Sequence, residues 1–517
     1  MEGGPSAAAS PTFRDLRHLA LPLYLPSFAT AIAQSLVVSV LPLFVKSSLG
    51  ADVATVGIVV GMQGIGSPLS GIPAGLVVDR LGERCGLLIG SAVCCTSYAA
   101  CAAVAIAFAP GSGSEAGRHA ARAGAVSLLA MARFLTGLGL GTFQVSRTGW
   151  VKEAVPKGLR GRANSLIGGC ARLANVIGPA VGGAAASMAG GAAAFLLQTV
   201  LGMAIVGLLL AVVPRHPRPQ RQASGPSNGA ASDGVKWSVG IGKERQEEAA
   251  RLQEEAAEGG ASAPAAASAP AGCACPPWLC ALLAVAPIGF SFAFIRAVRT
   301  LSIPLKADAM NLGVSGAGYV TAASFAFDSA SFPASGVLMD RYGRKAAGVP
   351  ALALMGAGFA LLGWAESVSE LVLASAILGV GNGLSSGLVM TIGQDAAPSD
   401  AKGRFLGLFK VCTDSALFAG PFSVGVLTAT FSLDTSCWVM CVVALASATW
   451  YAVRHQEPPP AGQPGRAVCA NSGIGTSTSR TQRQKHNRLV EELQELQDQV
   501  VAEGEAASSP SPASVRA

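Results

Sequence analysis

The sequence predicts an all-α membrane protein with twelve transmembrane helices in two groups of six, and three observations lead to this prediction. First, 51% of the 517 residues are hydrophobic and only 13% are charged, which is too apolar for a soluble chain of this length. Second, apolar stretches long enough to cross a bilayer recur on both sides of a polar centre. Third, one loop sequence occurs twice, at corresponding places in the two halves.

A spanning helix needs about 20 apolar residues, and twelve stretches meet this length. Six of them define an N-terminal bundle over residues 17–213, and the other six define a C-terminal bundle over residues 277–454. The predicted spans are residues 17–45, 52–78, 84–110, 123–147, 161–188, 191–213, 277–305, 313–339, 346–366, 369–393, 403–430 and 434–454.

Three polar segments flank the bundles. Residues 1–16 form a tail without the apolar core and cleavage site of a signal peptide. Residues 214–276 are charged and then rich in Ala, Ser and Pro, which predicts a disordered linker with one short surface helix. Residues 455–517 end in a short amphipathic helix with apolar residues at heptad-like spacing. This helix is either simply solvated or a binding site for a protein partner.

The repeated loop reads GLVVDRLGERC from Gly75 and GVLMDRYGRKA from Gly336. Both copies have Gly, three residues, Asp, Arg, one residue and Gly, with a basic residue soon after. Elsewhere the halves match at an offset of 242 residues, as for Gly178 and Pro179 with Gly420 and Pro421. The loops are 261 apart, because a longer loop around GSGSEAGRHAARAGA separates spans three and four. The matched loop positions are Gly75, Asp79, Arg80, Gly82 and Arg84, and Gly336, Asp340, Arg341, Gly343 and Arg344.

The net charge of +7 reflects membrane topology rather than nucleic-acid binding. If the twelve spans alternate, most basic residues fall on one side, and the loops of the other side hold mainly Lys46, Arg118, Arg122 and Lys306. Positive loops stay in the cytoplasm. Both termini and the central linker are therefore predicted to be cytoplasmic.

The motifs of enzymes and metal sites are missing from the sequence. There is no G-x-x-x-x-G-K-[ST] phosphate loop, no Ser-His-Asp set, and no further ligand to complete a metal site with Cys273 and Cys275. The twelve cysteines are scattered and give no disulfide framework. We expect no catalytic residue, no metal and no cofactor, and a proton gradient as the energy source.

With these paired loops, the chain resembles the major facilitator superfamily over all but its linker and tails. The resemblance implies two six-helix bundles related by a pseudo-twofold axis, which move against each other in alternating access. It also implies that each loop Asp latches onto a helix start of the other bundle. Asp79 would meet the start of span eleven near Arg404, and Asp340 the start of span five near Arg162, because a carboxylate is favoured at a helix N-terminus beside Arg.

Two further motifs are similar to those of proton-coupled exporters of drugs and other small molecules. RFLTGLGLG from Arg133 resembles a pattern in span four whose Arg is associated with proton coupling, and its counterpart in span ten is Ser375. ANVIGPAVGG resembles the exporter pattern G-x-x-x-G-P-x-x-G-G, with Ala174 in place of the first Gly. The resemblance implies helix packing at Gly178, Pro179, Gly182 and Gly183.

Charges inside the spans need a partner or a wet cavity, because an unpaired charge costs roughly 2.5–3.5 kcal/mol at the bilayer centre. Arg172 lies ten residues past Arg162, and Asp328 lies twelve before Asp340, so at 1.5 Å per residue they share one depth. Because spans five and eight are neighbours in the family, we expect an Arg172–Asp328 pair, either static or coupled to protons. Asp414 pairs with Lys410 four residues earlier or forms a second protonation site.

Other polar residues are candidates for the wall of a substrate cavity. Arg296 and Arg299 lie three apart in span seven, and we assign Arg296 to an anionic group of the substrate and Arg299 to the outer mouth. Uncharged candidates are Gln34, Gln63, Gln144 and Asn382, although hydrogen bonds between helices explain such residues equally well.

The sequence therefore predicts a secondary active transporter in a lipid bilayer that moves a small organic solute by proton-coupled export, as an antiporter. One alternative is an importer or uniporter of the same fold. The sugar transporters of the family usually carry P-E-S-P-R after span six. This chain has VPRHPRP there, which counts against a sugar transporter. Another alternative is a membrane scaffold or receptor that transports nothing and binds partners through its tail.

Overall fold

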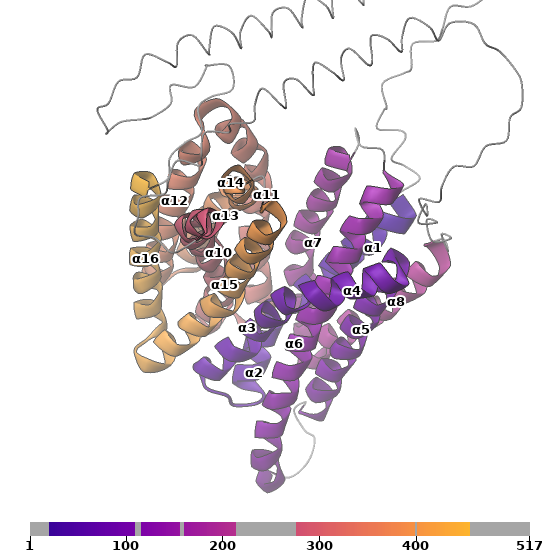
Figure 1. Cartoon of the computed structure of the whole chain (residues 1–517). Helices are drawn as coiled ribbons and strands as arrows, with labels where there is room; N and C mark the ends of the chain where they lie inside the picture. The colour runs from indigo at the N-terminus through magenta and orange to yellow at the C-terminus, as the bar shows by residue number, and fades with distance from the viewer. Residues whose placement is uncertain (1–19, 109–114, 156–159, 214–275, 399–400, 455–517) are drawn as a thin grey trace, which may run out of the picture. The chain divides into compact units, whose positions relative to one another are not determined.

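The computed structural model describes residues 20–108, 115–155, 160–213, 276–398 and 401–454. Every element within these ranges is helical (Figure 1). The two tails and the linker, apart from Pro276, lie outside them, and so do the predicted surface helix and tail helix.

The first half forms the N-terminal bundle. Its elements are η2 (Ala20–Tyr24), α1 (Leu25–Leu36), α2 (Val40–Ser47), α3 (Val53–Leu69), α4 (Gly71–Leu81), α5 (Glu83–Ala107), α6 (Glu115–Ala154), α7 (Arg160–Ala189) and α8 (Gly191–Val212). The helix α6 begins eight residues before the predicted span, so part of the insertion taken for a loop is helical. Glu, Ala and Arg dominate EAGRHAARA and favour a helix.

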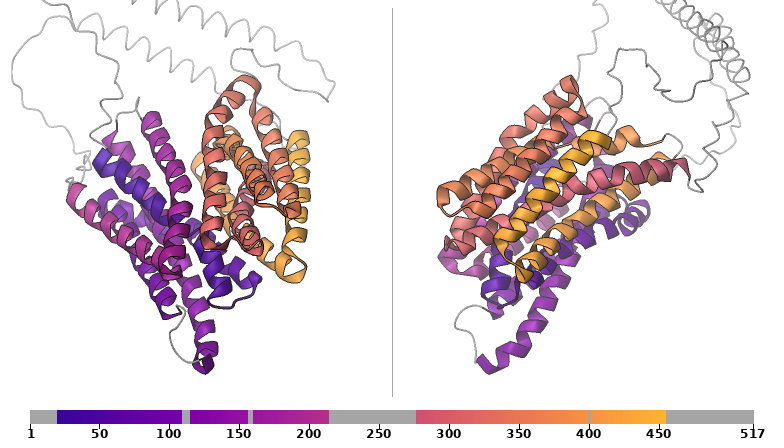
Figure 2. Two further views of the ribbon diagram at one scale, coloured as in Figure 1. Left: turned by 180° about the vertical axis from the view of Figure 1, so that it is seen from behind. Right: turned by 90° about the vertical axis from the view of Figure 1, so that its left-hand side faces the viewer.

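The second half forms the C-terminal bundle. Its elements are α10 (Pro277–Ala309), α11 (Gly313–Tyr342), α12 (Arg344–Trp364), α13 (Val368–Leu384), α14 (Leu388–Ala396), α15 (Lys402–Thr430) and α16 (Leu433–Arg454). In Figure 2 the helices of this half, salmon to yellow, lie side by side, as do those of the first half, indigo to magenta.

Within the described residues the helices account for twelve passes. Among the described residues, nine segments are long and apolar enough to cross a membrane, and the bent pair α3–α4 makes a tenth. The remaining two passes are α7 and α11, each 30 residues long. They are less apolar because Arg172 and Asp328 lie midway along them.

Three of the predicted spans are broken rather than continuous. The pass of α3 and α4 bends by 47° at Ser70, where Pro73 cannot donate to the carbonyl of Leu69. The pass of α1 and α2 is interrupted at residues 37–39, and that of α13 and α14 at residues 385–387. The last break lies beside the cavity described below.

Among the described residues, the bundles pack most closely at the end away from the repeated loops at Gly82 and Gly343. We call the end with these loops the motif side and the other end the opposite side. On the opposite side α3 packs on α15 and α7 packs on α11. A Cβ added to Gly57 or Gly183 there would lie within 3.1 Å of a glycine Cα in the other bundle. Towards the motif side, α4, α7, α11 and α15 have open space around several glycines, namely Gly71, Gly75, Gly168, Gly169, Gly336, Gly403 and Gly407.

Candidate functional site

A cavity of about 650 Å³ lies between the two bundles. It is lined by α2 and the break before it, α3, α6 and α7 of the first half and by α10, α11, α13 and α15 of the second. Apolar side chains such as Leu140, Phe325 and Leu417 form much of its wall, and ionisable groups interrupt them. The charged lining residues are Arg133, Arg172, Arg296, Arg299, Asp328, Lys410 and Asp414.

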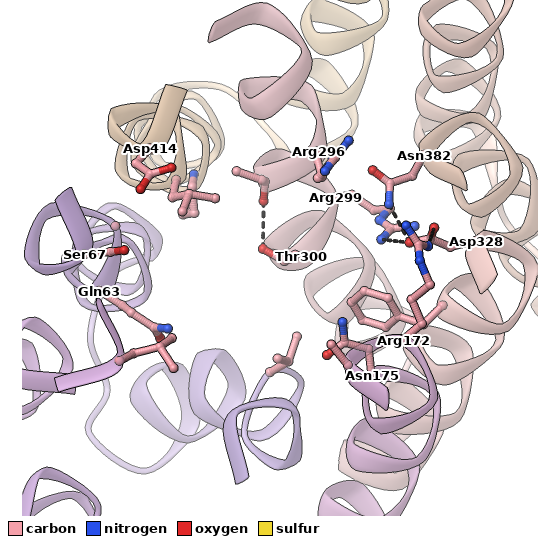
Figure 3. A pocket seen from close by; sticks show the side chains of 18 of the residues that line it. Gln63, Ser67, Arg172, Asn175, Arg296, Arg299, Thr300, Asp328, Asn382 and Asp414 are labelled. Carbon is pink, nitrogen blue, oxygen red and sulfur yellow. Dashed lines mark hydrogen bonds and ion pairs between the residues drawn. The ribbon is translucent and has the colours of Figure 1, made fainter. Parts of the chain in front are cut away.

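Asp328 is the centre of a buried cluster on this wall. Its side chain accepts hydrogen bonds from Arg172 Nη1 at 2.8 Å, Arg299 Nη2 at 3.3 Å and Asn382 Nδ2 at 2.5 Å (Figure 3). The ion pair predicted between Arg172 and Asp328 is therefore present, and it joins α7 of one bundle to α11 of the other. The Arg172 guanidinium also lies over the Phe332 ring, 4.0 Å from its centroid.

The break between α13 and α14 supplies further polar groups to this cluster. Gly387 has a φ of 81°, a left-handed conformation that glycine adopts without steric cost. The break frees backbone groups that would form hydrogen bonds within a continuous helix. The Ser385 side chain accepts from Arg296 at 3.1 Å, and Ser386 accepts from Arg172 through its side chain. The Ser335 hydroxyl donates to the Ser386 carbonyl at 2.9 Å.

The two arginines of α10 have different surroundings. Arg296 is half-buried, lines the cavity and donates only to Ser385 among the described residues. Arg299 is 2% exposed and donates to Ser324 and Asp328. The placement of Arg299 at the outer mouth is wrong, because Asp328 and Ser324 hold its guanidinium inside the bundle.

A chain of polar side chains lies on the N-terminal wall. Arg133 donates to the side-chain oxygen of Gln63, Gln63 donates to Gln34 at 3.1 Å, and Gln34 donates to Tyr98 Oη at 2.5 Å. Arg133, Gln63 and Gln144 line the cavity, whereas Gln34 lies behind Gln63. Gln34 therefore supports the wall in this conformation rather than forming it.

On α15, Lys410 Nζ lies 2.6 Å from Asp414 Oδ2, four residues along the helix. Both residues line the cavity. The local pair is thus present. A role of Asp414 as a second protonation site stays a prediction.

The predicted latch between Asp79 and Arg404 is open in this conformation. Asp79, Asp340 and Arg404 are exposed, and Asp79 and Arg404 form no ion pair with each other. The side chain of Arg162 lies outside the described residues. Gly82 and Gly343 have φ values of 85° and 90°, which explains why the motif needs glycine between its two helices.

The basic residue of the loop motif binds within its own bundle. Arg84 donates to the Leu210 carbonyl at 3.3 Å, and Lys345 donates to the Ala452 carbonyl at 2.7 Å. At the offset of 261 residues, Lys345 and not Arg344 is the counterpart of Arg84, so the assignment of Arg344 is corrected. Arg344 instead forms an ion pair with Asp395 at 3.0 Å. Leu210 and Ala452 lie in the last turns of α8 and α16. Arg84 and Lys345 therefore stabilise the free carbonyls at these helix ends.

The four residues predicted for helix packing serve two different contacts. A Cβ on Gly178 or Gly182 would meet Ser35 or Leu36 of α1 in the same bundle. A Cβ on Gly183 would meet Val314 and Gly318 of α11, and the Pro179 carbonyl also faces Gly318. The second contact therefore lies between the bundles.

Sequence reasoning missed several polar residues of the cavity. Ser385 and Ser386 were inside a span predicted to be continuous, although the S-S-G sequence before α14 is a turn signal. Asn175, Ser67, Ser329 and Thr300 also line the cavity. Single polar residues in membrane helices are common at helix contacts, so nothing in their spacing marked them.

The comparisons with known proteins agree with this architecture. The sequence model of the protein family named Major Facilitator Superfamily matches residues 23–239 and 285–490. The chain belongs to this superfamily. It is therefore an integral, multi-pass membrane protein of a family of secondary transporters rather than of enzymes.

Solved structures of such transporters share the fold of this superfamily member. A D-xylose-proton symporter has a TM-score of 0.61 at 15% identity, covering 86% of this chain and 99% of its own. A POT family transporter in complex with 5-aminolevulinic acid has a TM-score of 0.60 at 12% identity, covering 85% and 96%. The inward-open xylose transporter of E. coli has a TM-score of 0.58 at 15% identity, covering 84% and 94%.

One curated relative matches over a short stretch. Multidrug resistance protein 3 of Bacillus subtilis (strain 168) is 31% identical over 114 residues. This match covers 22% of each chain.

Proposed function

We propose that this transporter moves a small organic solute by proton-coupled alternating access, and that Asp328 and Arg172 couple the proton to the movement. The observation that carries the proposal is the ion pair between them, 2.8 Å long, which crosses the bundle interface beside the cavity. Asp328 belongs to the C-terminal bundle and Arg172 to the N-terminal bundle, so any reorientation that separates α7 from α11 breaks the pair.

Breaking the pair would leave the Asp328 carboxylate without the Arg172 guanidinium beside it. A nearby guanidinium favours the ionised carboxylate, and its withdrawal favours the protonated form. The Asp328 side chain is 8% exposed and that of Arg172 is 22% exposed, so the cavity gives water access to one partner. Proton uptake at Asp328 would then follow the conformation of the bundles, which is what coupling requires.

Export by antiport is the direction and mode that the motifs favour. The support is the likeness of RFLTGLGLG and ANVIGPAVGG to exporter patterns, and the local similarity to a protein named for multidrug resistance. We further propose that the motif side faces the cytoplasm, because most loop Arg and Lys residues lie there. Protease accessibility of a tag placed at either terminus would test this orientation.

The test of the function is transport in proteoliposomes with the purified full-length chain, a panel of organic solutes and an imposed pH gradient. We expect the gradient to drive movement of at least one solute, and Asp328→Asn to remove the effect of the gradient. Asp434→Asn is the matched control, because Asp434 also forms an ion pair, 2.6 Å from Lys306, but does not line the cavity.

Other outcomes would support the alternatives. Movement that ignores the gradient in the unsubstituted chain would indicate a uniporter. A chain that moves no solute at all would indicate a scaffold or receptor. Movement by Asp328→Asn that still follows the gradient would remove Asp328 from the coupling role.

A further inference from the structure

The cavity carries more positive than negative charge. Its lining includes five basic side chains and two acidic ones among the described residues. Lys410 and Asp414 neutralise each other at 2.6 Å, and Arg172 and Arg299 share the single carboxylate of Asp328. Arg133 and Arg296 then face the cavity without a carboxylate partner.

Arg296 is the more accessible of these two arginines. Its Nη2 donates to the Ser385 side chain at 3.1 Å, and its Nε is buried without a hydrogen-bond partner. Arg133 lies on the opposing wall, donates to the neutral Gln63, and also leaves its Nε without a partner. A cation buried without a counter-ion is costly within a membrane, so both positions favour an anion in the space they face.

We propose that the transported solute is an organic anion whose carboxylate or phosphate group binds Arg296, with Arg133 attracting it from the other wall. This proposal rests on the proposed proton coupling through Asp328 and Arg172, and it replaces the antiport proposed above with symport. The planar fork of a guanidinium binds such groups through two hydrogen bonds. The aliphatic and aromatic residues of the wall, among them Val37, Leu140, Phe325 and Leu417, suit the apolar body of the solute.

Asp328 links anion binding to protons. The charged groups near it are Arg172 from α7 and Arg296 and Arg299 from α10, while α13 contributes the neutral Asn382. The other charged cavity residues are Arg133, Lys410 and Asp414. When Asp328 is ionised it competes with the solute for the arginines, and when it is protonated the cluster becomes more positive. Anion and proton therefore strengthen each other's binding.

The sign of this linkage predicts the mode of transport. Ligands that favour each other's binding are carried together, whereas exchange requires that they compete. An anionic solute at Arg296 would therefore move with the proton, and the antiport favoured by the motifs would not apply to it.

The experiment measures the thermal unfolding temperature of the purified full-length chain at fixed ionic strength. The probes are sodium phosphate, benzoate, succinate and glycerol 3-phosphate, compared with tetraethylammonium and xylose. A ligand that binds the folded state raises this temperature. We expect at least one of the anions to raise it, with an affinity that increases as the pH falls, and neither comparison compound to do so.

Variants locate the effect. Arg296→Gln should weaken anion binding by about ten- to one-hundred-fold, the loss expected for one charge-assisted contact. Arg147→Gln is the control, because Arg147 is a half-buried arginine of α6 that does not line the cavity. Asp328→Asn should hold the affinity at its low-pH value throughout. If Arg296→Gln does not fold, Arg296→Lys, which keeps the charge without the fork, should still weaken binding.

The proposal is overturned if none of the anions raises the unfolding temperature, if tetraethylammonium does so instead, or if Arg296→Gln binds anions normally. These results leave the proposed function intact when Asp328 still governs pH-driven transport of another solute. Conversely, anion binding at Arg296 together with transport that ignores pH would refute the coupling and retain the anion site.

Discussion

Asp328 binds three side chains from three different helices, and two of these side chains are arginines. Removing one partner from a buried charge cluster costs about 3–5 kcal/mol, because the remaining charges lose their compensation. The cluster already has more arginines than carboxylates. Loss of the carboxylate should therefore be more damaging than loss of one arginine.

We accordingly expect Asp328→Ala to lower the free energy of unfolding by about 3–5 kcal/mol, and Arg299→Met by clearly less. The measurement is chemical unfolding of the purified chain in detergent, followed by circular dichroism. Because the two residues are in contact, their double variant should show a coupling energy of about 0.5–3 kcal/mol. Equal costs for the two single variants would mean that the cluster has no excess of positive charge.

At this scale the Arg172–Asp328 pair was predicted from two arguments together. Helix rise converts residue counts into depth, and the family resemblance implies that spans five and eight are neighbours. The sequence did not predict the position of Arg299, since rotation about a helix axis depends on which neighbours attract the side chain. The Lys410–Asp414 pair was predictable from its spacing alone. The counterpart of Arg84 was misassigned by one residue, although the offset between the loops was already known.

At the scale of helices, the two contacts between the bundles are made by equivalent residues of the repeat. Gly57 faces Pro421 and Gly425, and Gly318 faces Pro179 and Gly183. Gly57 and Gly318 are 261 residues apart, and Gly183 and Gly425 are 242 apart. Small residues allow helices to approach closely within a membrane. The duplicated sequence therefore closes the opposite side in the same way at both contacts.

A methyl group at such a contact should hold the opposite side open. We expect Gly183→Ala to increase amide hydrogen exchange at the ends of α7 and α11 on that side, because its Cβ would lie 2.8 Å from the Val314 carbonyl oxygen. The control is Gly169→Ala on the same helix, which has open space around it. Gly182→Ala should instead lower stability, since its Cβ meets α1 within the bundle. Unchanged exchange in Gly183→Ala would show that the contact tolerates a methyl group.

Element boundaries were predicted better than element breaks. Counting apolar residues finds where a helix lies in the bilayer, and most predicted spans overlap a helix closely. The same count does not register a break, because the residues of a break are also small or apolar. At residues 385–387 the left-handed Gly387 and the two serines end one helix and begin another, and the S-S-G turn signal is the mark that this break leaves in the sequence. The cavity owes its Ser385 and Ser386 to that break.

For the molecule as a whole, an ion pair supplements the glycine contacts on the opposite side. Lys46 of α2 lies 2.6 Å from Asp308 of α10, and the two side chains are 38% and 31% exposed. A pair this exposed is worth about 0.2–1 kcal/mol, which shifts a two-state population by up to about five-fold. Such a shift is enough to change the balance between two conformations of similar free energy.

We expect Lys46→Glu or Asp308→Lys alone to increase hydrogen exchange on the opposite side, because each places like charges together. The exchanged pair, Lys46→Glu with Asp308→Lys, should restore protection. The effect of each single variant should diminish in high salt, which screens exposed charges. A double variant that behaves like the sum of the two single variants would show that the pair does not hold the bundles together.

The latches on the motif side should act on the other conformation. Asp79 and Arg404 are exposed and apart here, so Asp79→Asn should leave the stability of this conformation nearly unchanged. It should nevertheless slow solute exchange in proteoliposomes by about two- to five-fold, since a carboxylate beside Arg at a helix start contributes about 0.3–1 kcal/mol to the state closed on the motif side.

The strongest form of this prediction combines both ends of the molecule. Asp79→Asn weakens the state closed on the motif side, and Lys46→Glu weakens the state closed on the opposite side. If the two contacts oppose each other through one conformational equilibrium, the double variant should exchange solute faster than Asp79→Asn alone. Hydrogen exchange on both sides should return towards the pattern of the unsubstituted chain. If the double variant instead exchanges solute more slowly than either single variant, the two ends act independently and the repeated loops have another role.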